Sequence, residues 1–258
     1  MSRFDTYHWH GVTLADSTLD AARAELEDPS GEEAALRGFV TLLRSGNLAA
    51  TGIALDHYHY AITRERHGFG SVLKEYREEV RRCARKILRQ GPAPGSATGA
   101  AMAGADWASA LLIMINQAEQ EDAEIIADAL DAPPNFDAES AAFRAAGRIL
   151  QQSTGTNERL VAVLSRAVFD EARDADERLE ALQALSRSPH AVTDLLRAAE
   201  LDDLELQATA VRALARLDLA AHRRLVEEKA ASWPEDAPYP ASDVRDVLAE
   251  LDDLEGDA

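Results

Sequence analysis

The segment DADERLEALQALSR, residues 174–187, returns in altered form as DLELQATAVRALAR, residues 203–216. Aligned start to start, the two segments pair similar residues: Ala181 with Ala210, Leu182 with Val211, Ala184 with Ala213, Leu185 with Leu214 and Arg187 with Arg216. Self-similarity of this kind is typical of proteins built from repeated structural units. The sequence therefore predicts a repeat array in the C-terminal half of the chain.

A weaker third copy, AAFRAAGRIL, occupies residues 141–150. A second segment with apolar residues at helical spacing follows each copy, over residues 158–170, 190–200 and 219–232. Small residues at the repeated positions let helices approach closely, while Leu and Val fill the space between layers. The pattern predicts stacked helical hairpins.

The stretch DLELQATAVRALARL, residues 203–217, resembles the first helix of a HEAT-like repeat. In that pattern an acidic turn precedes apolar and small residues that end in Ala-Leu-small-x-Leu. The resemblance is clearest over residues 137–232. It implies an all-α fold, an α-solenoid of stacked antiparallel helix pairs, with a concave face that most often binds another protein. It implies no catalytic residue.

The N-terminal half is also predicted to be helical, with an irregular, aromatic-rich and His-rich cap at its start. Residues 91–105, GPAPGSATGAAMAGA, carry no charge and little bulk, which is typical of a flexible linker or loop. The predicted division is an N-terminal helical region over 1–90, this linker or loop over 91–105, and HEAT-like repeats with an acidic C-terminal helix over 106–258.

The chain of 258 residues has 27 Lys and Arg against 46 Asp and Glu, and its net charge is −19. Such a charge repels phosphates, so direct nucleic-acid binding is disfavoured. A basic protein partner is favoured, although acidity can also serve solubility alone. A single cysteine excludes an internal disulfide. With no leader-like start and no long apolar run, we expect a cytoplasmic protein without a membrane span.

Arg81, Arg85 and Arg89 recur at helical spacing within the amphipathic stretch 71–90 and form one row. Arginine suits carboxylates and phosphates, so the row is a candidate partner-binding or anion-binding site. The alternative is a solvated face, or an internal partner for the acidic run 119–124.

Histidine gathers near the N-terminus, at His8, His10, His57, His59 and His67. His8 and His10 project to one side if their segment is extended, and Asp56 shares a helical face with His59. These four residues could hold a divalent metal such as Zn²⁺ if the fold brings them together. The alternative is that the segment packs as an aromatic cap, with its histidines at the polar edge.

The sequence contains no recognised catalytic or phosphate-binding motif. We therefore expect a non-enzymatic protein–protein interaction module, such as an adaptor, regulator or inhibitor, that needs no cofactor. The alternative is a metal-assisted or acid/base enzyme that uses the N-terminal His and aromatic cluster. A DNA-glycosylase activity, known among HEAT-like proteins, is disfavoured by the acidic composition.

Overall fold

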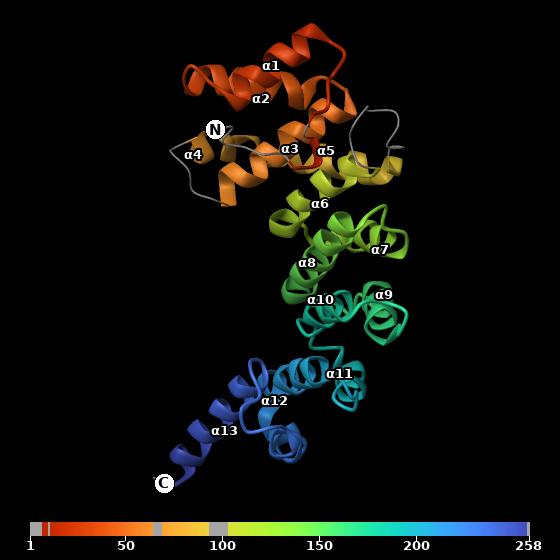
Figure 1. Ribbon diagram of the computed structural model, residues 1–258, viewed down its shortest axis with the longest axis vertical. Helices are drawn as coiled ribbons and strands as arrows, with labels where there is room; N and C mark the ends of the chain where they lie inside the picture. The colour runs from red at the N-terminus through yellow and green to blue at the C-terminus, as the bar shows by residue number, and fades with distance from the viewer. Residues whose placement is uncertain (1–6, 10, 64–68, 93–102, 257–258) are drawn as a thin grey trace. The chain divides into compact units, whose positions relative to one another are not determined.

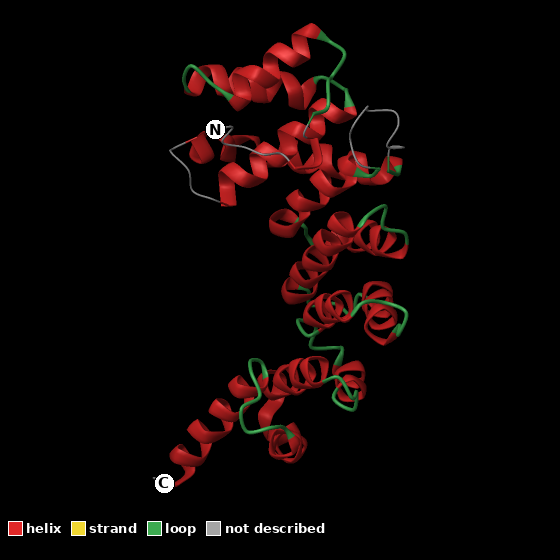
Figure 2. Ribbon diagram, in the orientation of Figure 1, coloured by secondary structure: helices red, strands yellow, loops and turns green. Residues whose placement is uncertain are grey.

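The computed structural model describes residues 7–9, 11–63, 69–92 and 103–256 (Figure 1). Every regular element in these ranges is a helix, which confirms the predicted all-α class (Figure 2). The chain divides into two compact units, Met1–Ala145 and Ala146–Ala258. None of the helices described is both long and apolar enough to cross a membrane.

The described part of the first unit contains, in chain order, η1 (Tyr7–Trp9), α1 (Ser17–Glu27), α2 (Glu32–Arg44), α3 (Leu48–Thr63), α4 (Phe69–Leu73), η2 (Lys74–Tyr76), α5 (Arg77–Gln90), α6 (Ala105–Gln117), η4 (Gln120–Asp122), α7 (Ala123–Asp131) and the start of α8 (Phe136–Gln152). The core forms around α3, which packs against α2, α6 and η1. The α3 helix is rich in small and apolar residues, and Ile53 and Leu55 on it are fully buried.

Local signals explain where the first two helices begin and why they pack. The Asp16 side chain caps α1 by accepting hydrogen bonds from the backbone N–H groups of Thr18 and Leu19. A Cβ added at Gly38 on α2 would lie 2.4 Å from the carbonyl oxygen of Ala22 on α1. The absence of a side chain at this position therefore lets α2 lie directly on the backbone of α1.

The predicted continuous amphipathic helix over 71–90 is divided into α4, η2 and α5. At the division, Tyr76 packs edge-on against Phe39, with ring centroids 5.6 Å apart. The predicted linker or loop over 91–105 coincides mostly with residues outside the described ranges. The flanking helices α5 and α6 pack against each other, and the two compact units divide between Ala145 and Ala146 instead.

The second unit holds the end of α8 and five further helices: α9 (Glu158–Phe169), α10 (Ala175–Leu185), α11 (Val192–Ala198), α12 (Leu204–Ser232) and α13 (Ala241–Gly256). The α9 helix packs against α10, and α12 packs against α10, α11 and α13. The aligned Ala and Leu or Val positions of the repeat are buried in both α10 and α12. Matching sequence positions thus have matching burial.

The α12 helix covers both the second repeated segment and the predicted helix that follows it. Asp218 has non-helical backbone angles, φ −161° and ψ 90°, and produces a kink within α12. Its carboxylate accepts a hydrogen bond from the backbone N–H of Ala221, as an N-cap does. The predicted boundary between the two segments is therefore present as this kink.

Candidate functional site

The predicted row of arginines on α5 is largely committed to the chain's own carboxylates. Arg81, only 5% exposed, donates hydrogen bonds to Glu119 and to Glu121, the latter at 3.0 Å. Arg85 Nε donates to Asp122 Oδ1 at 2.5 Å, and Asp122 is fully buried. These ion pairs join α5 to the η4 segment, as the internal-partner interpretation expects. Arg89, the third member, is exposed.

The structure brings two of the predicted metal-ligand candidates together, His8 and Asp56. His8 Nδ1 lies 3.4 Å from Asp56 Oδ2, and His8 Nε2 lies 3.4 Å from Asp137 Oδ2. His59 on the same helix instead packs its ring edge-on against Tyr60, and His10 lies outside the described residues. Among the described residues, no group of three or more His, Cys, Asp or Glu side chains is arranged to hold a metal ion.

The environment of His8 favours its protonated form. Burial lowers the pKa of His8, but the hydrogen bonds to Asp56 and Asp137 and the charges of these carboxylates raise it above the ordinary value of 6.5. His57 shows the opposite effect, because burial and the charge of Arg23 lower its pKa to about 4. His57 is therefore neutral at pH 7, whereas His8 is biased toward an ion pair.

Trp9 anchors the segment that carries His8. Its indole N–H donates to Ser109 Oγ at 2.8 Å, and its ring lies where a Cβ at Gly52 would be. The Trp9 side chain is 1% exposed, and His8 is 7% exposed. The short η1 helix is thus fixed on α3 and α6 by a buried aromatic ring and a histidine held by two carboxylates. The segment packs on the helices as the aromatic-cap interpretation expects, but His8 is buried between two carboxylates and does not lie at a polar edge.

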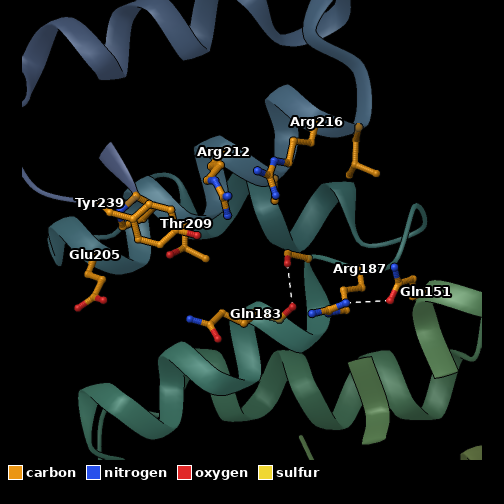
Figure 3. A pocket seen from close by; sticks show the side chains of 12 residues that line it. Gln151, Gln183, Arg187, Glu205, Thr209, Arg212, Arg216 and Tyr239 are labelled. Atoms are coloured by element: carbon orange, nitrogen blue, oxygen red, sulfur yellow. Dashed lines mark hydrogen bonds between the residues drawn. The ribbon is translucent and has the colours of Figure 1, made fainter. Parts of the chain in front are cut away.

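A pocket of about 480 Å³ lies within the second unit and contains a different set of side chains (Figure 3). It is lined by Gln151 of α8, by Gln183, Ser186 and Arg187 at the end of α10, by Glu205, Thr209, Arg212, Ala213, Arg216 and Leu217 of α12, and by Tyr239 and Pro240 before α13. The lining is rich in guanidinium, amide, hydroxyl and carboxylate groups, which can form hydrogen bonds with a ligand.

Three arginines dominate the electrostatics of the pocket. Arg212 Nε donates to Asp243 Oδ2, and Arg216 Nη2 lies 3.4 Å from the same oxygen. The Arg212 guanidinium also lies over the Tyr239 ring, 4.8 Å from its centroid. From the facing side, Arg187 Nη1 donates to Gln151 Oε1 at 2.8 Å. In Figure 3, Glu205 lies at the end of the pocket opposite Arg187 and Gln151.

This pocket is not among the sites predicted above, although the sequence contains one signal for it. Arg187 and Arg216 occupy aligned positions of the repeat, and both line the pocket. Alignment of exposed residues is informative because a repeated helix carries each repeated position to the same face. No comparable sequence pattern points to Asp137, which lies against His8.

Comparison with protein-family models, with curated proteins and with solved structures finds no match for this chain.

Proposed function

We propose that this protein is a non-enzymatic protein-binding module, an adaptor, regulator or inhibitor, with HEAT-like helix pairs as its scaffold. The arginine-rich pocket with Tyr239 beside it carries this proposal. Tyr239 is 60% exposed although it is a large aromatic side chain. Tyrosine and arginine are over-represented among residues that dominate binding energy at protein interfaces. A surface of this composition favours recognition of another chain over catalysis.

The net charge of −19 affects how such a partner approaches. Long-range attraction raises the association rate of a partner of opposite charge, with a strong dependence on salt. We therefore propose a partner that is basic overall. Contacts within the pocket would then contribute mainly to the lifetime of the complex.

Affinity purification of the intact protein at low ionic strength from a lysate of its source, with mass spectrometry of the eluate, tests this function. We expect a stoichiometric basic protein that raised salt releases. Tyr239→Ala should reduce its recovery. Phe136→Ala is the matched control, because Phe136 is an aromatic residue of similar exposure, 59%, outside the pocket. Recovery of no stoichiometric partner would refute the proposal.

A further inference from the structure

We infer that the pocket lined by Arg187, Arg212 and Arg216 binds a carboxylate-bearing segment of a protein partner, with one or two Asp or Glu side chains next to an apolar residue. The inference rests on the proposed protein-binding function and names the chemistry that this surface recognises.

The chain's own Asp243 shows which ligand chemistry suits these arginines. A single oxygen of this carboxylate contacts both Arg212 and Arg216. A guanidinium has five N–H donors in a planar fork that matches the geometry of a carboxylate. The contacts with Asp243 and Gln151 occupy only some of these donors. Arg187 and Arg216 are both exposed and retain donors for a second carboxylate.

The arginines border one pocket from two different parts of the chain. Arg187 follows α10 and Arg216 lies on α12, at aligned positions of the repeat. Figure 3 shows both side chains on the border of the same hollow, together with the side chains of Thr209 and Gln183. A hydroxyl and an amide can bond to either oxygen or N–H groups of a peptide backbone. The volume of about 480 Å³ lies in the range of pockets that enclose a small ligand.

The charge balance favours a carboxylate over a phosphate. Glu205 lines the pocket and Asp243 contacts two of its arginines, so the three positive charges are largely offset. Each carboxylate brings a single negative charge to one guanidinium, whereas a phosphate monoester concentrates nearly two negative charges on one group at pH 7. The net charge of −19 also repels anions at long range. Binding of an acidic segment must therefore come from local geometry.

The exposed ring of Tyr239 is the reason to expect an apolar residue next to the carboxylate of the ligand. It lies against the Arg212 guanidinium and offers an apolar face beside the charged donors. An aliphatic side chain next to the carboxylate would remove this face from water. Glu205, at the other end in Figure 3, disfavours a long polyanionic ligand and suits a donor group there.

Fluorescence anisotropy of labelled peptides at low ionic strength tests the inference. The probe is Gly-Ser-Glu-Leu-Glu-Ser-Gly, and its matched partner carries Gln in place of both Glu residues. We expect saturable binding of the Glu peptide and at least about tenfold weaker binding of the Gln peptide, since each lost charged contact leaves arginine donors unmatched. The double variant R187Q with R216Q should lose this preference, and R89Q, which removes an exposed arginine elsewhere, should retain it.

Equal binding of the two peptides by the unchanged protein would overturn the inference. Tighter binding of a peptide with phosphoserine in place of the first Glu would also overturn it, in favour of a phosphate-binding site. Failure of the inference is separable from failure of the proposed function. If affinity purification yields a partner that R187Q with R216Q retains fully, the function stands and the carboxylate site is refuted; if no partner is recovered, the function itself fails.

Discussion

The two units place arginine in opposite situations. In the first unit, Arg81 is buried and bonded to acidic residues of η4 and the residues beside it. In the second unit, Arg187 and Arg216 also follow a pattern, since they lie at aligned repeat positions, but they remain exposed at a pocket. Spacing alone therefore does not distinguish a structural arginine from one that is available for binding. The distinction depends on whether the fold brings enough carboxylates of the same chain to the guanidinium.

The largest expected effect is in the first unit. Replacing Arg81 with Ala leaves Asp122 buried and deprived of one of its cationic neighbours. Asp122 keeps its hydrogen bonds with Arg85, and Glu119 and Glu121 are at least half exposed, so we expect the free energy of unfolding to fall by about 2 to 3 kcal/mol. Urea denaturation measures the change. Arg89→Ala is the matched control and should change stability by less than about 0.5 kcal/mol. Equal losses of stability in the two variants would show that the ion pairs of buried Arg81 do not stabilise the fold more than exposed Arg89 does.

The second prediction concerns acid stability. The folded-state pKa of His57 is lowered to about 4, so only the unfolded chain takes up this proton between pH 6.5 and pH 4. Titration of His57 therefore leaves the free energy of unfolding unchanged above pH 6.5 and lowers it as the pH falls toward 4. Between pH 7 and pH 5 the loss is about 2 kcal/mol.

His57→Gln should remove this part of the pH dependence from urea midpoints measured at pH 7 and pH 5. His190→Gln, which changes an exposed histidine of the second unit, should leave it intact. If His57→Gln retained the full slope, the lowered pKa of His57 would be refuted.

A smaller effect is expected at His8, with the opposite sign. Its folded-state pKa is raised, so its stabilising contribution is complete below pH 6.5 and is lost as the pH rises through that raised pKa. Asp137→Asn should lower the pKa of His8, as followed by NMR of its ring. Because Asp137 is 37% exposed, the loss of stability at pH 6 should stay below about 1 kcal/mol. An unchanged His8 titration would show that Asp137 does not act on this ring.

Local patterns predicted the elements and the buried repeat positions, because helical periodicity places Ala181 and Leu185 on the inner face regardless of distant contacts. They could not predict that His8 meets Asp137, because the two residues are far apart in the chain and come together only in the folded structure. The Arg81 cluster can be anticipated from the sequence as an alternative, because the acidic run 119–124 offers partners of opposite charge. Tyr76 illustrates a further limit, since its contact with Phe39 is tertiary and accompanies the division of a helix that periodicity predicts as continuous.

The smallest change in stability is expected for a substitution at the pocket. This substitution gives the exposed arginines a carboxylate of the chain's own, as Arg81 has in the first unit. Thr209→Glu would place a carboxylate of the chain's own among Arg187, Arg212 and Arg216, much as acidic side chains surround Arg81 in the first unit. The position is partly exposed and glutamate is a good helix former, so stability should change by less than about 1 kcal/mol.

Binding of the Glu-containing peptide should nevertheless weaken at least about tenfold in Thr209→Glu, since the new carboxylate competes for the same donors and repels the ligand. Thr209→Gln is the matched control, because it adds the same bulk without the charge and should retain most of the affinity. Anisotropy titrations of both variants decide the point. If the glutamate variant binds the peptide as well as the glutamine variant does, the pocket arginines do not bind it through unoccupied donors. Arg187 and Arg216 would then contribute no more to peptide binding than the exposed Arg89.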